Sequence, residues 1–544
     1  MGKVIGIDFG TTNTVVAYME NNTIKIIANH NGNELTPSVV AKLQDKLLIG
    51  EEAKANVKAF SNGDGIKEIK REIGKGERIY FAGEYMYASD IASLILGKVK
   101  GNAEEYFEEE VKDAVITVPA EFSDAQRKEI IESAVKAGLN VKKIINEPTA
   151  ALLAYTHNNY TNKKVLCYDF GGGTFDVSIA NISSNGVEVI AVGGDRELGG
   201  KDIDEILVQA ILDDIKINRK KELSKYGKYQ LVLAVEEAKI ELTRKVSASI
   251  SIPSLRTTSG NMPYTKTISR VYFNGLIRKV ITKTINDLRD TLDSKNISLS
   301  EINEVVLVGG SSKMPIVKQE LSALFGNKII ELKDMDKLVA MGAAIEAANI
   351  SGVNNSSRSK IKRDVCPFSL GLKVYRDGSD NVFDPIVLKN SPYGVEFSEK
   401  YNTAFDRQNS MILEIYQGES QCATENEHIT DFEITGIPQS AAGEEWVRIT
   451  FKYDENGIIN IKAKILSTGL EKVHQYKYGY DLKRKVDSTI AEKNIIDSNL
   501  RITATKAKEQ LEKEGLSSLA GQISNHVKYE QKEQLTDILE ELYR

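Results

Sequence analysis

The chain has 544 residues, a formal net charge of −6, 41% hydrophobic residues and 27% charged residues. This length predicts three or four domains, and the composition is typical of a globular protein. The acidic balance argues against a general nucleic-acid-binding role, and no apolar run is long enough to cross a membrane.

The N-terminus leads directly into a predicted strand at Val4–Phe9, so we expect no secretory signal. The three cysteines, Cys167, Cys366 and Cys422, are far apart and form no C-x-x-C pair. Their number and spacing argue against a disulfide framework or a zinc site and favour a reducing, cytoplasmic location.

Residues 1–353 alternate apolar strands with helical segments, which predicts an α/β domain. One short strand is expected at Val115–Val118. After it, Ser123 and Gln126 have the spacing of a capping box and predict the start of a helix, and Gly138 predicts its end.

Two segments of this domain resemble each other, at Ile5–Thr12 and Leu166–Thr174. Each is an apolar strand that ends in Asp-Phe-Gly and is followed by glycine or hydroxyl residues. Each predicts a hairpin whose tight turn presents backbone N–H groups to an anion, so two facing hairpins would hold the phosphates of a nucleotide. Asp8 and Asp169 would hold Mg²⁺, mostly through water, because Mg²⁺ keeps several of its waters.

Either hairpin alone could equally be an ordinary glycine turn with a solvated aspartate. The duplication within one α/β domain favours the phosphate-binding interpretation. The chain contains no G-x-x-x-x-G-K-[ST] sequence, which excludes a P-loop ATPase.

A third glycine loop, Gly309-Gly310, lies between a predicted strand at Val305–Val308 and a helix that begins near Pro315. Two glycines there would let a flat group such as a nucleoside approach closely. Glu236, Lys239 and Thr243 form one polar stripe on a predicted helix. This stripe could hold a ribose and a base edge, or it could simply face solvent.

Residues 354–365 are poor in apolar side chains and predict a linker. Residues 366–480 change to period-2 alternation, as in Val447–Phe451 and Ile459–Ala463, with a turn at Asp454–Gly457. This pattern predicts an antiparallel β domain. Residues 481–544 place apolar residues at helical spacing among many charges, which predicts a short helical tail.

In combination and order, the motifs of the chain resemble those of the DnaK-type (seventy-kilodalton heat-shock) chaperone family. They are Ile7–Asn13, Ile69–Arg71, Thr117–Ala120, Ile145–Ala151, Asp169–Asp176, Leu198–Gly200, Val306–Gly310, Phe368–Gly371, Tyr416–Glu419 and Asp431–Ile437. The resemblance covers most of residues 1–480. It implies an actin-like α/β ATPase domain with duplicated halves, an antiparallel β-sandwich that binds peptides, and an α-helical lid at residues 481–544.

The resemblance also implies roles for matched residues. Those expected to be catalytic are Lys70, Glu147, Thr174 and Asp169. Those expected to hold Mg²⁺ and a monovalent cation, K⁺, are Asp8, Asp169 and Asp176. Those expected to bind ATP or ADP are Gly10, Thr11, Thr12, Asn13, Gly171, Gly172, Gly173, Thr174, Gly199, Gly200, Glu236, Lys239, Thr243, Gly309, Gly310, Ser311, Lys313 and Asp336.

Two further sets concern communication and peptide binding. The residues expected to carry the nucleotide state between domains are Pro119, Arg127, Lys143, Ile361 and Asp364. The residues expected to line a groove for an extended peptide are Leu372, Val374, Tyr375, Ala404, Met411 and Leu413. Without the resemblance, this second set would be interpreted as the core of a β-sandwich.

Several positions depart from the family pattern. Lys143 and Lys313 replace arginines, and Glu121 replaces an aromatic residue. The family's linker has a run of leucines where this chain has Lys360–Arg363. The segment between Arg71 and Val115 and the tail are shorter than in the family, and the arginine that latches the lid is missing.

The resemblance implies an ATP-hydrolysing chaperone whose nucleotide cycle controls the binding and release of extended apolar segments of unfolded proteins. Its implied partners include a J-domain co-chaperone and a nucleotide exchange factor, and neither nucleic acid nor a membrane. An alternative is an actin-like ATPase that serves as an adaptor for one fixed partner, which the altered linker and short tail favour. A small-molecule kinase on the same fold is disfavoured, because no acceptor-substrate domain is evident.

Overall fold

The computed structural model describes residues 3–474 except residues 45, 57–59, 61–62, 158–161, 355–359 and 377. Residues Met1–Gln475 form one compact unit. The predicted helical tail at residues 481–544 lies outside the described residues.

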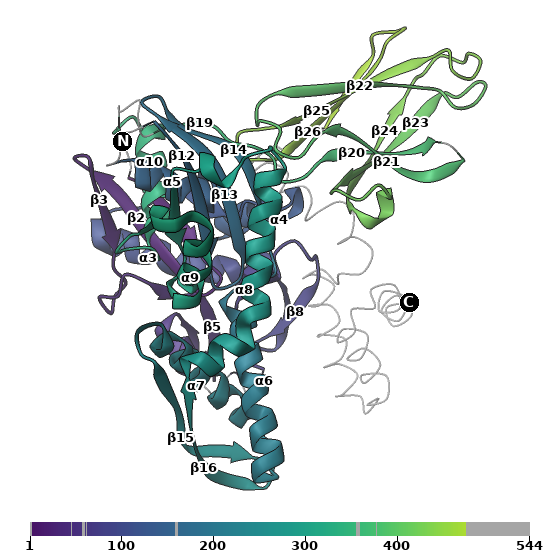
Figure 1. Ribbon diagram of the computed structural model, residues 1–544. Helices are drawn as coiled ribbons and strands as arrows, with labels where there is room; N and C mark the ends of the chain where they lie inside the picture. Colours follow the sequence, from purple (N-terminus) through teal and green to yellow (C-terminus); the bar gives the residue numbers. More distant parts are fainter. Residues whose placement is uncertain are drawn as a thin grey trace, which may run out of the picture. The chain divides into compact units, whose positions relative to one another are not determined.

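Two mixed sheets organise the α/β domain (Figure 1). The first has the strand order β11-β10-β1-β2-β3, and the second has the order β18-β17-β12-β13-β14-β19. The strands of the first are β1 (Val4–Phe9), β2 (Asn13–Glu20), β3 (Thr23–Ile27), β10 (Asp113–Val118) and β11 (Asn140–Asn146). Those of the second are β12 (Lys163–Phe170), β13 (Phe175–Ser183), β14 (Gly186–Asp195), β17 (Glu304–Val308), β18 (Ile329–Glu331) and β19 (Ile361–Arg363).

The two sheets repeat one topology. β1 pairs in parallel with β10 and antiparallel with β2, and β12 pairs in parallel with β17 and antiparallel with β13. The strands β1 and β12 contain the two Asp-Phe-Gly ends that the sequence repeat identified. Each of these strands therefore delivers its aspartate and its glycine turn to the same edge of its own sheet.

Helices α5 (Glu147–His157) and α10 (Leu338–Ile350) join the two halves. α10 packs on β1 and β2, whereas α5 packs on β12, β13 and β14, so each helix also contacts the sheet of the other half. The helices cross backbone to backbone, because a Cβ at Gly342 would lie 1.8 Å from the Ala150 carbonyl oxygen. Likewise, a Cβ at Gly6 would lie 2.2 Å from the Ala344 backbone nitrogen, so neither glycine can be replaced without moving the backbone.

The remaining elements surround these sheets, and α6, α7, β15 and β16 extend from them as a separate lobe (Figure 1). The other helices are α1 (Glu51–Lys54), α3 (Ala88–Phe107), α4 (Asp124–Lys136), α6 (Gly200–Arg219), α7 (Lys225–Arg244), α8 (Arg270–Asp293) and α9 (Pro315–Phe325). A sixth, short strand of the first sheet, β4 (Thr36–Pro37), pairs with β2. The other strands of the domain are β5 (Val39–Leu43), β6 (Lys46–Ile49), β7 (Gly65–Lys67), β8 (Arg78–Phe81), β9 (Glu84–Tyr87), β15 (Ser247–Thr257) and β16 (Gly260–Ser269).

The local signals for helix ends in this domain are confirmed. α4 begins directly after Ser123, whose backbone N–H donates to Gln126 Oε1, and Gly138 takes the left-handed conformation with φ of 76° just beyond its end. α9 begins at Pro315, and α7 includes the whole polar stripe.

A β-sandwich follows the α/β domain, and all its strand pairings are antiparallel, as predicted. Its sheets have the orders β21-β20-β23-β24 and β22-β25-β26-β27. Their strands are β20 (Leu370–Arg376), β21 (Ser379–Val387), β22 (Glu396–Asn402), β23 (Ser410–Gln417), β24 (Glu427–Thr435), β25 (Trp446–Tyr453), β26 (Ile459–Ile465) and β27 (Glu471–His474). The alternating segments Val447–Phe451 and Ile459–Ala463 lie in β25 and β26, with their inward side chains in one apolar core.

The segment predicted as a linker contains a strand. Ile361–Arg363 forms β19, which pairs in parallel with the edge of β14. Lys362 Nζ and Arg363 Nη1 lie 3.7 Å and 3.3 Å from the Glu188 carboxylate on β14. The sequence did not predict this strand, because its charged side chains show no apolar alternation. Its pairing depends instead on the backbone of β14 and on Glu188, which is distant in the sequence.

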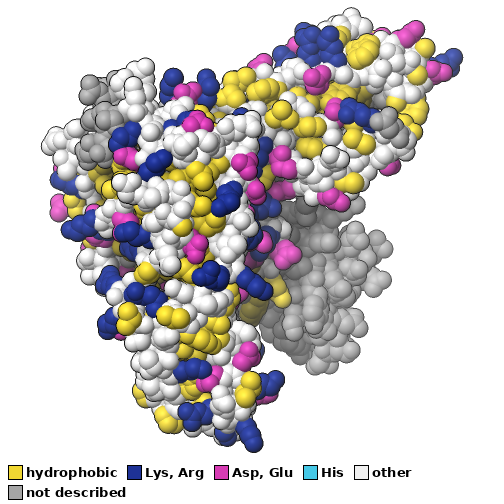
Figure 2. All heavy atoms as spheres, viewed as in Figure 1, with side chains coloured by type: hydrophobic (Ala, Val, Ile, Leu, Met, Phe, Trp, Pro, Cys, Tyr) yellow, Lys and Arg dark blue, Asp and Glu magenta, His cyan; other side chains and the backbone are white. Residues whose placement is uncertain are grey.

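Basic and acidic side chains are interspersed over the face of the molecule shown in Figure 2. None of the helices in the described part of the chain combines the length and apolar character that a membrane crossing requires.

Candidate nucleotide site

A cavity of about 420 Å³ lies where the turns of the two sheets meet. It is lined by the turn after β1, the turn after β12, the loop after β17 and one face of α7. The predicted residues that line it are Asp8, Gly10, Thr11, Thr12, Asn13, Lys70, Glu147, Asp169, Gly171, Gly172, Gly173, Thr174, Glu236, Lys239, Thr243, Gly309, Gly310, Ser311, Lys313 and Asp336. The fold therefore brings segments that are more than 300 residues apart in the sequence into one site.

The two glycine turns face each other at close range. A Cβ at Gly172 would lie 2.0 Å from Thr12 Oγ1, and a Cβ at Gly173 would lie 2.3 Å from Thr11 Oγ1. No side chain fits at Gly172 or Gly173, because the side chains of Thr12 and Thr11 already occupy that space. Such turns suit the oxygens of a polyphosphate, because backbone N–H groups are the donors available to it.

Gly199 and Gly200, which were expected to bind nucleotide, do not line this cavity. They lie behind the second turn, where the Gly200 N–H donates to the Gly171 carbonyl at 3.0 Å. A Cβ at Gly199 would lie 2.5 Å from the Gly172 carbonyl oxygen. The two glycines therefore hold the turn in place from outside.

Three aspartates form an acidic group around the two turns. Burial, helped by the Glu147 charge, raises the pKa of Asp8 to about 7, although Lys70 opposes the shift. Burial and the charge of Glu147 raise the pKa of Asp176 to about 8 and that of Asp169 well above its usual range. These shifts arise because burial removes the water that would stabilise the ionised carboxylates and Glu147 adds a like charge, and together these effects outweigh the opposing charge of Lys70 where it acts on Asp8 and Asp169.

The acidic group fits a cation held mainly through water. Asp176 Oδ2 is buried and has no hydrogen-bond partner among the described residues. No three acidic, histidine or cysteine side chains of the described part of the chain lie close enough together to ligate a metal directly. Asp176 itself does not line the cavity but stands behind it, which is consistent with contact through water.

Lys70 and Glu147 form a buried ion pair at one end of the cavity. Lys70 lies in the turn η1 (Ile69–Arg71), and its side chain is 3% exposed. Glu147 is the first residue of α5, where the helix dipole favours a negative charge. The pair places an ammonium group beside the aspartates, and this is the arrangement that phosphoryl transfer requires for charge stabilisation.

The polar stripe on α7 faces the cavity rather than solvent alone. Lys239 Nζ donates to Asp204 Oδ2 at 2.8 Å, and Glu236 Oε1 accepts from Lys54 Nζ at 2.8 Å. Lys313 pairs with Asp336 at 2.9 Å on the opposite rim. The structure therefore places the three residues of the stripe on the wall of the cavity.

Some lining residues were not identified from the sequence. They are Val15, Leu35, Ile240, Arg244, Met314, Met335 and Val339. Most are apolar and would suit the face of a base. Four of them, Ile240, Arg244, Met314 and Met335, stand directly beside predicted residues, and the other three had no such signal in the sequence.

A chain of hydrogen bonds leads from the acidic group to the β-sandwich. Asp176 Oδ1 accepts from the Ala120 N–H at 2.8 Å, directly after Pro119. The Arg127 guanidinium, 2% exposed, donates to the carbonyls of Ala120 and Asn456 at 3.0 and 3.3 Å. Asn456 belongs to the turn between β25 and β26, so Arg127 links the segment that binds Asp176 to the sandwich.

Asp364, just after β19, is also buried beside this path. Its Oδ2 accepts from Thr149 Oγ1 at 2.8 Å and from Asn146 Nδ2 at 3.2 Å, and burial raises the pKa of its carboxyl group. Lys143, in contrast, pairs with Glu346 of α10 at 2.6 Å. It is therefore held against α10 rather than extended into solvent.

Comparison with known proteins identifies the family. The sequence model described as "Hsp70 protein" matches residues 4–80 and 76–544. The proteins named "Chaperone protein DnaK" from Thermotoga petrophila and Thermotoga maritima are each 37% identical to this chain over 476 residues, which cover 86% of this chain and 79% of theirs. The chain belongs to the Hsp70 family.

Hsp70 proteins are ATP-dependent chaperones that bind ATP or ADP with Mg²⁺, and this chain is an ATPase and a chaperone of that family. Its α/β part is the actin-like ATPase domain and its β part is the β-sandwich of an Hsp70. The glycine turns, the acidic group and the Lys70–Glu147 pair lie in the ATPase domain.

The peptide-groove candidates differ in burial. Leu372 and Leu413 belong to the core of the sandwich, and Val374 and Met411 pack against that core. Tyr375 is largely exposed, as is Ala404. The sequence could not separate these classes, because both faces of a strand carry apolar residues here.

We expect the stability of this Hsp70 chain without nucleotide to fall as pH rises from about 4 to about 8. In the folded state the carboxyl groups of Asp8 and Asp176 keep their protons up to about pH 7 and 8, whereas in the unfolded chain they lose them near 3.8. Their contribution is complete below the unfolded pKa and is lost as pH rises through the folded pKa. Calorimetric unfolding across this range measures the slope.

The Asp8→Asn variant should show a shallower fall of unfolding temperature with pH than the unaltered chain. Asp380→Asn, at an exposed position of strand β21, is the matched control and should leave the slope unchanged. Equal slopes for all three proteins would contradict the assignment of the slope to the acidic group.

Proposed function

We propose that this chain uses ATP hydrolysis in the cavity to control peptide binding by its β-sandwich. The observation that carries the proposal is the buried Lys70–Glu147 pair at the end of a cavity walled by two facing glycine turns. Lys70, Glu147, Thr174 and Asp169 are proposed as the catalytic residues. Asp8, Asp169 and Asp176 are proposed to hold Mg²⁺ and K⁺, which supply charge neutralisation when bound.

The proposed mechanism is positioning and charge stabilisation. The backbone N–H groups of the two turns bind the phosphates, and the Lys70 ammonium stabilises negative charge at the terminal phosphate. Glu147 keeps Lys70 oriented and accepts a hydrogen bond from the attacking water. No covalent intermediate is required, because phosphoryl transfer to water depends chiefly on alignment and electrostatics.

The finer organisation is also a proposal. We place the ATPase domain at residues 1–353 with duplicated halves, the linker at 354–365, the sandwich at 366–480 and a helical lid at 481–544. Leu372, Val374, Tyr375, Ala404, Met411 and Leu413 are proposed to form the groove for an extended peptide. A J-domain co-chaperone and a nucleotide exchange factor are the proposed partners, and the cytoplasm is the proposed location.

ATP turnover of the full chain with and without an unstructured apolar peptide tests the proposal. Stimulation by the peptide supports the chaperone cycle. Turnover that the peptide does not change, together with capture of one folded protein, would favour the adaptor function, which the basic linker suggests. The absence of turnover under all conditions would contradict both.

Coupling between the domains should depend on salt, since β19 is held at the edge of β14 partly by Glu188. Its two basic partners are half exposed, so the pairs are weak individually and screened by ions. The Debye length falls from about 10 Å at 0.1 M salt to about 3 Å at 1 M. Peptide release on ATP addition should therefore be larger at low salt.

Glu188→Gln should reduce peptide release at low salt to the level seen at high salt. Glu301→Gln, which removes a surface pair with Lys164 elsewhere on the ATPase domain, is the control and should leave the salt dependence intact. Fluorescence anisotropy of a labelled peptide after ATP addition measures both. Large release that is independent of salt would refute the electrostatic account.

A further inference from the structure

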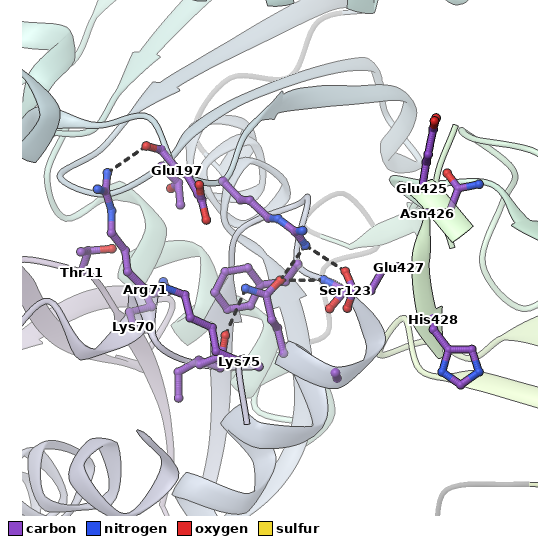
Figure 3. Close-up of a pocket in the computed structure, with 17 residues that line it drawn as sticks. Thr11, Lys70, Arg71, Lys75, Ser123, Glu197, Glu425, Asn426, Glu427 and His428 are labelled. Carbon is purple, nitrogen blue, oxygen red and sulfur yellow. Dashed lines mark hydrogen bonds and ion pairs between the residues drawn. The ribbon is translucent and has the colours of Figure 1, made fainter. Parts of the chain in front are cut away.

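A second cavity, of about 510 Å³, adjoins the nucleotide cavity. Thr11, Lys70 and Thr174 line both cavities, so they form the boundary between them. The other walls of the second cavity come from the segment after η1, the first turn of α4, the residues after β14 and the β-sandwich (Figure 3). None of the functions described above uses this space.

The part of the second cavity formed by the ATPase domain is basic. Lys70, Arg71, Lys75 and Arg196 all line it, and Glu197 is the acidic residue among the lining residues of this domain. Arg71 is bound to Asp202 at 2.6 Å, yet its Nε is buried and has no hydrogen-bond partner among the described residues. Lys75 is half exposed, and its partner Glu72 is exposed as well, so Lys75 can turn toward an anion at little cost.

Ser123 gives a second, independent sign of an anion. It is the residue before α4, lines the cavity and is 1% exposed, and its Oγ has no hydrogen-bond partner in the described part of the chain. A buried hydroxyl without a partner is costly, and the start of a helix attracts negative charge. The negative charge of Asp124, the first residue of α4, is compensated by an ion pair with Lys128, and its Oδ1 accepts from the Ile459 N–H of the sandwich at 2.9 Å.

The wall formed by the sandwich is acidic. Glu425 and Glu427 lie in the segment at the start of β24, and Figure 3 shows them on the side of the cavity opposite Lys70 and Lys75. Glu427 pairs with Arg196 at 3.1 Å, and Glu425 accepts from Ser420 Oγ at 2.5 Å. An anion is thus attracted by the basic residues near Lys70 and repelled by the acidic residues of the sandwich wall. This distribution of charge favours brief passage of an anion through the cavity over stable binding there.

We propose that the second cavity is the route by which inorganic phosphate leaves after hydrolysis. This rests on the proposed function of the nucleotide cavity. There the water oxygen forms a bond to the terminal phosphorus of ATP, and the bond to the bridging oxygen breaks. The products are ADP, hydrogen phosphate and a proton. Phosphate formed beside Lys70 and Thr174 can pass into the second cavity while ADP still fills the first.

The test uses a substitution that narrows the second cavity and leaves the lining of the nucleotide cavity unchanged. Ala125 lines the second cavity on the exposed side of α4, so Ala125→Trp fills it without replacing a buried residue. Val135→Trp is the matched control, because Val135 is exposed on the same helix but lies outside the cavity. In single turnovers of the full chain, acid quenching measures hydrolysis and a fluorescent phosphate-binding protein measures release.

We expect Ala125→Trp to hydrolyse ATP at the normal rate but to release phosphate at least about tenfold more slowly, a factor that corresponds to a modest added barrier. Val135→Trp should be normal in both steps. Release that keeps pace with hydrolysis in Ala125→Trp would overturn the proposed route alone. No hydrolysis in the unaltered chain would overturn the proposed function and the route together.

Charge provides a second measurement in case the tryptophan disturbs α4. Lys75→Glu should also delay phosphate release, whereas Lys75→Arg, which keeps the positive charge, should release phosphate at the normal rate. Hydrolysis should be unchanged in both variants. Normal release from Lys75→Glu combined with normal release from Ala125→Trp would show that phosphate leaves elsewhere.

Discussion

We expect Lys70→Ala to slow ATP hydrolysis at least about a hundredfold while nucleotide affinity changes little. The backbone N–H groups of the facing turns still hold the phosphates, whereas the ammonium group that pairs with Glu147 is removed. Loss of a donor aimed at developing charge acts on the chemical step and not on binding. Single-turnover hydrolysis and fluorescent-nucleotide titration separate the two effects.

The same substitution leaves Glu147 unpaired beside Asp8 and Asp169. Lys70 now lowers the pKa of both aspartates, so its removal raises them further. Removing one partner of a buried pair costs about 3–5 kcal/mol, and the unfolding temperature must therefore be measured in parallel. Lys70→Met keeps the aliphatic stem, and Lys46→Ala, at an exposed pair, is the control. Unchanged hydrolysis in Lys70→Met with an intact fold would refute the catalytic assignment.

We expect Met411→Glu to weaken binding of a leucine-centred peptide at least about a hundredfold, because an unpaired charge in an apolar pocket is costly to desolvate. Met411 is half-buried against the sandwich core, so a carboxylate there has no apolar contact to offer a peptide. Anisotropy of a labelled peptide with the full chain measures the loss.

Ile412→Glu is the matched control for this result. Ile412 is the next residue of β23, 64% exposed, and its side chain points to the opposite face of the sheet. It should bind peptide normally. Equal loss in both variants would mean that the sheet has been disturbed, and normal binding by Met411→Glu would place the groove elsewhere. Leu413→Glu is unsuitable, because Leu413 lies in the core and its replacement would unfold the sandwich.

The parts of the fold that short-range signals specify were predictable. The repeated Asp-Phe-Gly strands, the capping pair at the start of α4 and the alternation of β25 and β26 depend on neighbours in the sequence. The strand β19 was not predictable in this way. It has no apolar alternation, and its place depends on a free edge of β14 that lies about 175 residues earlier in the chain.

The residues of the site likewise differ in whether a short-range signal in the sequence identifies them. Glycine turns and strand-end aspartates could be recognised from their own residues. Lys70, in the charged run Lys67–Glu72, looks like a surface lysine and was singled out by family resemblance alone. Its burial follows from a partner 77 residues away and from the left-handed backbone at Glu68, which turns the segment inward. The contact of Arg127 with Asn456 likewise has no local signal, because it joins residues 329 apart.

The crossing of α5 and α10 determines how the nucleotide cleft can open. At Gly342 and Ala150 the two halves are in contact through backbone atoms, with no side chain between them. A change of side-chain rotamer therefore cannot make room for the two helices to slide past each other. The remaining freedom is rotation of the halves as rigid bodies about this crossing, which acts as a pivot. Atoms in contact need about 3.5 Å, whereas a Cβ at Gly342 would have 1.8 Å. One added methyl group at Gly342 would therefore push the two helices apart, and the resulting displacement of the two halves would increase with distance from the crossing toward the nucleotide.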